Sequence, residues 1–176
     1  MREQLISSTL QNQVIEQQSF IDPLTEIYNR RSLDRVAGQF ISQARRRNTP
    51  LTFLMIDVDK FKQVNTRFGH LTGDFVLSEI AALLRVSTRG ADAVVRYGGD
   101  EFLILLADTR AEGARKVIDR INVRLEEWNG AGHLEGFEVR LSIGAAEWSD
   151  GQTLDEVLDG ADQKMYEHKP APALAP

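Results

Sequence analysis

The chain has 176 residues, of which 42% are apolar and none is cysteine, and its formal net charge is −5. This length allows one domain with a sizeable hydrophobic core, and the composition is that of an ordinary globular protein. The absence of cysteine excludes disulfides and thiolate chemistry. Because the net charge is negative, the protein as a whole does not attract duplex nucleic acid. A polyanionic ligand would need local lysines or a bound metal ion.

Three parts are expected along the chain. Residues 1–20 are rich in glutamine and carry apolar residues at helical spacing, which predicts a connector helix. Two interpretations of this helix are open: a solvated N-terminal helix, or the end of a signalling coiled coil that enters from an upstream domain. The Asp22-Pro23 pair ends it. Residues 21–169 form the globular domain, and the tail over 170–176, PAPALAP, is expected to be flexible.

The sequence has no apolar run long enough to span a bilayer and no signal peptide. We therefore expect a cytoplasmic domain. A membrane anchor of the natural protein would lie outside this chain.

Hydrophobic periodicity predicts alternating helices and strands over the globular domain. A charged helix is expected over about 30–47, a buried strand over 51–58, a short turn or helix over 60–66, a helix over 72–86, and two strands over 93–97 and 102–106. Thr109-x-x-Glu112 and Thr153-x-x-Glu156 are capping-box patterns that predict the starts of two further helices, and Asn129-Gly130 ends the first of them. Alternating apolar residues over 137–143 predict a half-buried strand between these helices. The order indicates an α/β domain of the α+β kind, with helices covering one sheet.

Residues 96–105, RYGGDEFLIL, place two glycines and two acids between two apolar segments. Acids and glycines both weaken strands, so this turn needs a reason other than packing. The 51–58 strand ends in Asp57, and we expect this strand end to meet the turn that carries Asp100 and Glu101. Clustered carboxylates repel one another unless a cation neutralises them, and Mg²⁺ bound by carboxylates and substrate phosphates is the natural candidate. A single acid of this kind would be a solvated turn residue, but the cluster beside Gly98-Gly99 favours a phosphoryl-transfer site.

The turn Gly98-Gly99-Asp100-Glu101-Phe102 matches the signature of the GGDEF family, the diguanylate cyclases. DPLTEIYNRR at 22–31, MIDVDKFKQVNTRFGHLTGD at 55–74 and ADQKMYEHK at 161–169 also resemble segments of that family. The resemblance covers about residues 20–169. It implies a palm-like, mostly antiparallel, five-stranded central sheet wrapped by helices and related to nucleotide cyclases and polymerase palms.

The resemblance also implies a bacterial second-messenger reaction. Two GTP molecules condense to cyclic di-GMP with release of two pyrophosphates, as the 3′-hydroxyl of each GTP attacks the α-phosphate of the other. Each subunit holds one GTP with two Mg²⁺ or Mn²⁺ ions, so catalysis implies a homodimer. An upstream sensory domain is implied for the full-length protein.

Metal-binding and catalytic roles carry over from the family by position. Asp57 and the backbone carbonyl of Val58 resemble metal ligands, and Asp100 matches the acid that binds metal and is a candidate for deprotonating the 3′-hydroxyl. Many relatives have Glu where this chain has Asp100, which has a shorter reach. Glu101 matches a position that supports metal or ribose binding. Whether a protein carboxylate or a bound hydroxide takes the proton stays open.

Nucleotide-binding roles also carry over from the resemblance. They are phosphate contacts from Phe61, Lys62 and Lys169, guanine contacts from Asn65 and Asp74, and a close approach of the nucleotide at Gly98 and Gly99. An isolated lysine would be a surface charge, and an isolated Asp74 a helix N-cap. As a guanine reader, the Asp74 carboxylate accepts from N1–H and the exocyclic amine, and adenine would leave it unpaired at a cost of about 1–3 kcal/mol.

The chain departs from the family after Lys169. Relatives continue with a glycine and a phosphate-binding arginine, whereas this sequence continues with Pro170-Ala171-Pro172. We expect weaker triphosphate binding as the consequence.

A second motif, Arg89-Gly90-Ala91-Asp92, matches the family's inhibitory RxxD motif. The resemblance implies that a cyclic di-GMP dimer bridges this motif to another arginine, for which Arg120 is the candidate, and holds two active sites apart. The alternative is a surface ion pair between residues i and i+3.

Two other functions remain open beside an active cyclase. One is a receptor that binds GTP or cyclic di-GMP without catalysis, which the altered residues after Lys169 favour slightly. The other is a cyclase or polymerase-like enzyme for other nucleotides, against which Asp74 argues.

Overall fold

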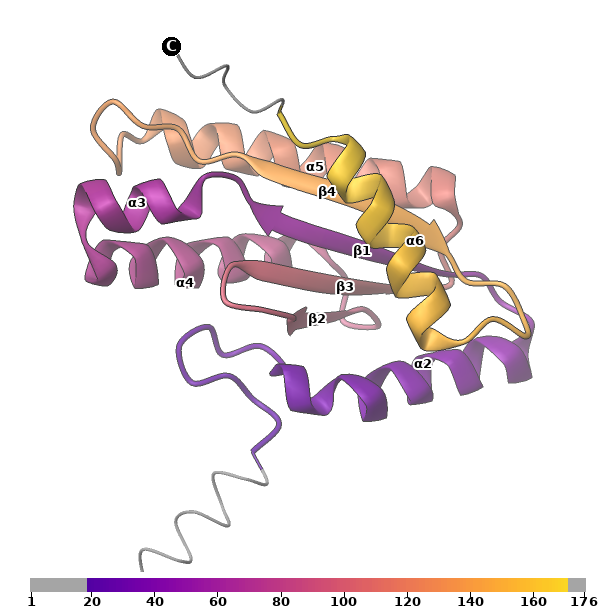
Figure 1. Ribbon diagram of the computed structural model, residues 1–176. Helices are drawn as coiled ribbons and strands as arrows, with labels where there is room; N and C mark the ends of the chain where they lie inside the picture. Colours follow the sequence, from indigo (N-terminus) through magenta and orange to yellow (C-terminus); the bar gives the residue numbers. More distant parts are fainter. Residues whose placement is uncertain (1–18, 171–176) are drawn as a thin grey trace, which may run out of the picture.

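The computed structural model describes residues 19–170, which form a four-stranded sheet flanked by helices (Figure 1). Every pair of neighbouring strands is antiparallel, and the strand order is β2-β3-β1-β4. The elements are η1 (Arg30–Ser32), α2 (Leu33–Arg47), β1 (Leu51–Val58), α3 (Phe61–Phe68), α4 (His70–Ser87), β2 (Ala93–Arg96), β3 (Glu101–Ala107), α5 (Ala111–Gly130), β4 (Leu141–Glu147) and α6 (Leu154–Glu167).

Strand β1 is the centre of the fold. All eight of its residues are buried, since it pairs with β3 on one side and β4 on the other. Its side chains alternate between two cores: Leu54 and Ile56 pack with apolar residues of α4 and α5, while Phe53 and Met55 pack with α2 and α6. Because helices cover both faces, the strand is a continuous apolar run rather than a polar–apolar alternation. Each such buried side chain contributes about 1.5–3 kcal/mol.

Helix α6 lies directly on β4 because Gly144 has no side chain. A Cβ at this position would collide with the backbone carbonyl of Ala161 and the backbone nitrogen of Met165. The Thr153 side chain accepts from the Glu156 N–H and the Glu156 side chain accepts from the Thr153 N–H, so the predicted capping box is confirmed. These contacts fix where the C-terminal end of α6, and therefore Lys169, lies relative to the sheet.

The predicted capping box at Thr109 and Glu112 is wrong. Helix α5 begins at Ala111, one residue later than that pattern requires, and its N-cap residue is Arg110. The Thr109 hydroxyl donates to the Ala107 carbonyl instead, and the Ala111 N–H donates to the Glu147 side chain on β4. A neighbouring carbonyl and a distant side chain have thus replaced the partners that the pattern predicted.

The expectation of five strands is also wrong for residues 19–170, and the strand expected over 137–143 begins later, at Leu141. The Asn129 side chain holds both the N–H and the carbonyl of Val139. Gly132 and Gly136 have φ of +73° and +63°, and residues 131–136 form turns and bends while 137–140 have no regular structure. The palm-like sheet wrapped by helices is otherwise confirmed.

The connector helix expected over 1–20 and the flexible tail expected over 170–176 lie almost wholly outside the described residues. None of the helices within residues 19–170 combines the length and the hydropathy needed to cross a bilayer.

Candidate active site

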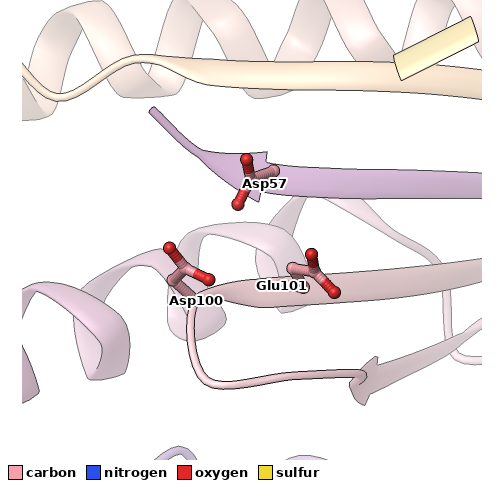
Figure 2. Close-up of side chains that lie close together, drawn as sticks. All are labelled: Asp57, Asp100 and Glu101. Carbon is pink, nitrogen blue, oxygen red and sulfur yellow. The ribbon is translucent and has the colours of Figure 1, made fainter. Parts of the chain in front are cut away.

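Three carboxylates converge at one end of the central strands (Figure 2). Asp57, near the end of β1, lies directly opposite Glu101, the first residue of β3. Asp100 is held beside them because its carbonyl accepts from the Val58 N–H at 3.0 Å. Ligand oxygens of the three side chains lie within 4.8 Å of one another, as the antiparallel pairing of the strand end with the turn predicted.

Burial and mutual repulsion raise the pKa of two of these acids. Partial burial raises the pKa of Asp100, and the negative charge of Asp57 raises it further. The pKa of Glu101 is raised by burial and then by Asp57 and Asp100. The cluster therefore lacks positive charge, and a divalent cation would relieve it. Carboxylate and carbonyl oxygens are the ligands that Mg²⁺ and Mn²⁺ prefer, so the residues fit such an ion.

Lys169 partly supplies the missing positive charge. Its Nζ lies 2.7 Å from Asp57 Oδ2, although the lysine side chain is 38% exposed. The hydrogen bond to Asp57 is the main cause that raises the pKa of Lys169. The sequence predicted a phosphate contact for this lysine, and the structure places its ammonium group on a predicted metal ligand.

The segment that follows β1 leaves the start of α3 without a side-chain cap. Lys60 adopts the left-handed region with φ of 55°, and its side chain does not cap α3. The backbone amides at the start of α3, from Phe61 onward, therefore have no side-chain cap, and a helix N-terminus of this kind attracts negative charge. The Lys62 side chain is exposed on the same first turn.

Asp59 fixes this segment to the neighbouring strand. Its N–H donates to the Arg140 carbonyl at 2.9 Å, and its Oδ1 accepts from the Ser142 hydroxyl at 2.7 Å. Burial raises the pKa of Asp59, and the nearby Asp57 adds to the effect. Ser142 was not predicted as a site residue, because its partner lies 83 residues away in sequence and no local pattern indicates the bond.

Asn65 on α3 and Asp74 on α4 are both available to a ligand. Within residues 19–170 no hydrogen bond engages either side chain; Asn65 is half-buried and Asp74 is exposed. The two helices approach closely because Gly73 lies against Asn65 and Phe61, with no room for a Cβ. Helix α4 begins at His70, so the alternative assignment of Asp74 as an N-cap is wrong.

The turn at Gly98 and Gly99 does not need the left-handed backbone, since neither residue has a positive φ. The two glycines differ in their surroundings. A Cβ on Gly98 would press on the Glu101 side chain, whereas a Cβ on Gly99 would face open space. The N–H groups of Tyr97 and Gly98 both donate to the Glu101 carbonyl, at 2.8 and 3.1 Å. The turn thus carries Asp100 and Glu101 on a short, closed loop.

Arg96 fixes the turn to the N-terminal segment. Its guanidinium donates to the Gly99 carbonyl at 2.9 Å and pairs with the Asp22 carboxylate at 3.1 Å. Burial works against the Asp22 carboxylate, but hydrogen bonds from Thr25 and the Arg96 charge outweigh it and hold the pKa of Asp22 below its ordinary value. Asp22 was predicted only as a helix breaker, so this supporting role was missed.

The RxxD segment lies away from the acid cluster, at the opposite end of β3. The Asp92 carboxylate accepts from the N–H groups of Arg89 and Ala107, and the Arg89 guanidinium donates to the Ala107 carbonyl. The side-chain ion pair between Arg89 and Asp92 is longer, at 3.6 Å. Arg120 on α5 donates twice to the Ser87 carbonyl, at 2.8 and 2.6 Å, so its guanidinium is anchored two residues from Arg89.

Comparison with known proteins settles the family. A family described as "Diguanylate cyclase, GGDEF domain" matches residues 19–173. The chain belongs to the GGDEF family. The GGDEF domain is 37% identical over 147 residues to the diguanylate cyclase DosC of Escherichia coli K12, covering 83% of this chain and 32% of that protein. It is 34% identical over 151 residues to the response regulator PleD of Caulobacter vibrioides, covering 84% of this chain and 33% of PleD.

Solved structures of GGDEF proteins agree with this assignment. Diguanylate cyclase SiaD of Pseudomonas aeruginosa, crystallised with its activator SiaC, superposes with a TM-score of 0.77 at 32% identity, over 95% of this chain and 64% of SiaD. The GGDEF domain of DgcB from Caulobacter crescentus, in complex with c-di-GMP, gives a TM-score of 0.78 at 25% identity, over 85% of this chain and 89% of that one. The chain spans about a third of the length of the curated relatives.

Proposed function

We propose that this GGDEF domain is a diguanylate cyclase that condenses two GTP molecules into cyclic di-GMP and two pyrophosphates. In each half-reaction a 3′-hydroxyl oxygen forms a bond to an α-phosphorus, and the bond from that phosphorus to the pyrophosphate oxygen breaks. The observation that carries the proposal is the convergence of Asp57, Asp100 and Glu101. Asn65 and Asp74, whose side chains form no hydrogen bonds within residues 19–170, lie on α3 and α4, the two helices that follow β1. Membership of a family whose relatives are named diguanylate cyclases supports it.

Guanine selection is assigned to Asn65 and Asp74. The exposed Asp74 carboxylate accepts from N1–H and the exocyclic amine of guanine, two donors that adenine lacks at those positions. If adenine bound here, the carboxylate would lose its water and find no hydrogen-bond donor. This loss costs about 1–3 kcal/mol of binding free energy, and more for a charged group. The substrate is therefore GTP.

Phosphate binding is assigned to the start of α3 and to two lysines. The uncapped amides from Phe61 onward and the Lys62 ammonium group contact the β- and γ-phosphates, and Lys169 supplies a second positive charge. In this assignment Lys169 turns toward the phosphate from Asp57, from which its Nζ is 2.7 Å away in this structure. The nucleotide passes close to Gly98 and Gly99, where Gly99 leaves space.

Divalent metal binding is assigned to Asp57, the Val58 carbonyl and Asp100. These residues would hold Mg²⁺ or Mn²⁺, two ions in the proposed cyclase, which would neutralise phosphate charge and help to align the attacking and leaving oxygens. Asp100 is the candidate acceptor of the 3′-hydroxyl proton, and Glu101 supports the metal or the ribose. One domain holds one GTP, so two domains must face each other as a homodimer; a sensory domain elsewhere in a longer protein would control that pairing.

Product feedback is assigned to the RxxD segment. The Arg89 guanidinium donates to the Ala107 carbonyl, and the Arg120 guanidinium donates to the carbonyl of Ser87, two residues before Arg89, so both arginines are held near the RxxD segment. Such groups bind phosphate and guanine edges by bidentate hydrogen bonds. Cyclic di-GMP would bind there and hold the active sites apart. Added cyclic di-GMP should slow the wild type and leave an Arg89→Ala variant unaffected.

The reaction is tested by incubating the protein with GTP and Mg²⁺ and identifying the product by mass. The wild type is expected to form cyclic di-GMP, and Asp100→Asn to form none while keeping its fold. Asp108→Asn is the matched control, since Asp108 is an exposed acid at the opposite end of β3. GTP or cyclic di-GMP binding without turnover by the wild type would support the receptor function instead, and turnover of ATP would contradict the role of Asp74.

A further inference from the structure

Two hydrogen bonds attach the residue that follows β1 to the neighbouring strand β4 and the residue before it. The Asp59 N–H donates to the Arg140 carbonyl at 2.9 Å, and the Ser142 hydroxyl donates to Asp59 Oδ1 at 2.7 Å. Ser142 is buried and lies directly opposite Asp57 in the sheet. Asp59 is therefore held by its backbone and by its side chain, two positions after a predicted metal ligand.

These bonds fix the direction of the peptide group between Val58 and Asp59. A peptide group is planar and trans, so its carbonyl and its N–H point in opposite directions. Since the Asp59 N–H points toward β4, the Val58 carbonyl points away from β4, toward β3. The Val58 N–H agrees with this direction, because it donates to the Asp100 carbonyl and the two backbone groups of a strand residue lie on the same side.

The Val58 carbonyl is an unused acceptor beside the acid cluster. No hydrogen bond to it is found within residues 19–170, although Val58 is only 1% exposed. A buried carbonyl without a partner is unfavourable, and carbonyl oxygens are among the ligands that Mg²⁺ and Mn²⁺ accept. This oxygen therefore fits the metal position that is assigned to Asp57 and Asp100.

The bend that follows this peptide group needs support from outside the segment. Lys60, the next residue, has a left-handed backbone with φ of 55°, which is unfavourable for a residue other than glycine. Such a conformation persists only where the surrounding structure holds it. Without the bond from Ser142, the Asp59 side chain is free to turn and the preceding peptide group can rotate. The Val58 carbonyl would then lose its direction.

We propose that Ser142 and Asp59 are positioning residues that direct the Val58 carbonyl to the metal site, and that the Asp59 carboxylate is not itself a metal ligand. Asp59 does not belong to the group of carboxylates whose oxygens lie within 4.8 Å of one another, since its Oδ1 is turned to Ser142. Residues that orient metal ligands commonly contribute to metal affinity without touching the ion. This inference rests on the metal-dependent function proposed above.

The first test replaces Ser142 by threonine, which keeps the hydroxyl, and by valine, which has nearly the volume of threonine without a hydroxyl. Mn²⁺ affinity is measured by titration calorimetry without nucleotide, and hydrogen exchange of the Asp59 amide by NMR without metal. Ser142→Val should bind Mn²⁺ roughly tenfold more weakly than Ser142→Thr and should exchange the Asp59 amide faster. In GTP turnover its half-saturating Mn²⁺ concentration should rise by the same factor, and excess Mn²⁺ should restore kcat.

Asp59→Asn and Asp59→Ala separate positioning from metal ligation. Both variants lose the negative charge, but asparagine keeps an oxygen that accepts from the Ser142 hydroxyl. The difference between them therefore measures the hydrogen bond alone, and Asp59→Ala should bind Mn²⁺ roughly tenfold more weakly than Asp59→Asn. Equal weakening of Mn²⁺ binding in the two variants would show that Asp59 acts through its charge or as a ligand, and would overturn the proposal.

Thr52→Val is the matched control for the loss of a buried hydroxyl. Thr52 is buried near the other end of β1, and its hydroxyl donates to the Thr109 carbonyl at 2.7 Å. This variant should lose stability in urea unfolding without a change in Mn²⁺ affinity. If Thr52→Val weakened Mn²⁺ binding as much as Ser142→Val, the effect would be a general loosening of the sheet, and the proposal would be wrong.

The same measurements distinguish failure of this proposal from failure of the cyclase function. A wild type that binds Mn²⁺ but forms no cyclic di-GMP would contradict the cyclase function, while weaker Mn²⁺ binding by Ser142→Val would still support the positioning role. A wild type that forms cyclic di-GMP, with Ser142→Val and Ser142→Thr equal in Mn²⁺ affinity and amide exchange, would refute the positioning role alone.

Discussion

The Lys169 ammonium group lies 2.7 Å from the Asp57 carboxylate, at the centre of the acid cluster. The same carboxylate is the one that family position assigns to a metal ion. Two cations this close repel each other, so we expect Lys169 and a divalent cation to compete for this side of Asp57. In the proposed cycle Lys169 would leave this carboxylate for a phosphate of the bound nucleotide.

Replacing Lys169 by alanine should separate metal binding from turnover. Without its competitor, Asp57 should bind Mn²⁺ severalfold more tightly in the absence of nucleotide, which titration by electron paramagnetic resonance would measure. GTP turnover should fall roughly tenfold or more, because a phosphate contact is lost. Lys164→Ala, on α6 and away from the acids, is the control. Unchanged Mn²⁺ affinity in Lys169→Ala would rule out the competition.

The acid cluster should make the metal-free protein less stable as pH rises. The pKa values of Asp100 and Glu101 in the folded protein exceed their ordinary values of 3.8 and 4.5, so the folded state holds these protons more tightly than the unfolded state. Their contribution to stability is complete below the ordinary values and is lost as pH rises through the raised values. The Asp100→Asn/Glu101→Gln variant should therefore gain stability over the wild type at pH 7 with chelator present. Urea unfolding at pH 4 and pH 7 would check this, and a difference of equal size at both pH values would refute it.

Gly144→Ala should disturb the site through α6. Its Cβ would collide with backbone atoms of Ala161 and Met165, and overpacking of this kind costs about 1–3 kcal/mol. Urea unfolding should show that loss, and GTP turnover should fall because Lys169 moves with the helix. Gly160→Ala is the control on the same helix, since its Cβ would make an ordinary 3.7 Å contact with Ala146. It should be neutral or stabilising by about 0.5–1 kcal/mol, and equal destabilisation by both variants would contradict the packing argument.

Arg96→Ala should loosen the turn that carries Asp100. It removes the donor to the Gly99 carbonyl and leaves the partly buried Asp22 without its ion-pair partner. We expect a loss of about 1–3 kcal/mol at pH 7 and a lower rate of GTP turnover. Because the pKa of Asp22 is lowered in the fold, this stabilisation is present above its ordinary value of 3.8 and disappears as pH falls through the lowered one. The stability difference between wild type and Arg96→Ala should accordingly shrink in acid, as denaturation at pH 3 would show.

Local sequence patterns predicted the elements whose determinants are themselves local. The apolar run at 51–58 and the capping box at Thr153 need no distant partner, and both are as expected. The pattern at Thr109 failed because its hydroxyl donates to the neighbouring Ala107 carbonyl and accepts from the distant Arg89 guanidinium. The position of the acids followed from pairing a strand end with a hairpin turn.

Supporting residues of the site could not be predicted in this way. Ser142 contacts Asp59 over 83 residues of sequence, and Arg96 contacts Asp22 over 74. A serine on a strand and an arginine before a turn are unremarkable in isolation, since surface positions commonly hold both. The contact between Lys169 and Asp57 likewise depends on how α6 lies on β4, which Gly144 decides.

The central claim is that Asp57 and Asp100 hold divalent metal next to a guanine nucleotide. A crystal structure with Mn²⁺ and a non-hydrolysable GTP analogue, with data collected at the manganese edge, tests it most directly. The account predicts anomalous peaks at the carboxylates of Asp57 and Asp100, guanine at Asn65 and Asp74, and Lys169 moved from Asp57 to a phosphate. Manganese bound away from these acids, or nucleotide bound with Lys169 still paired to Asp57, would contradict it.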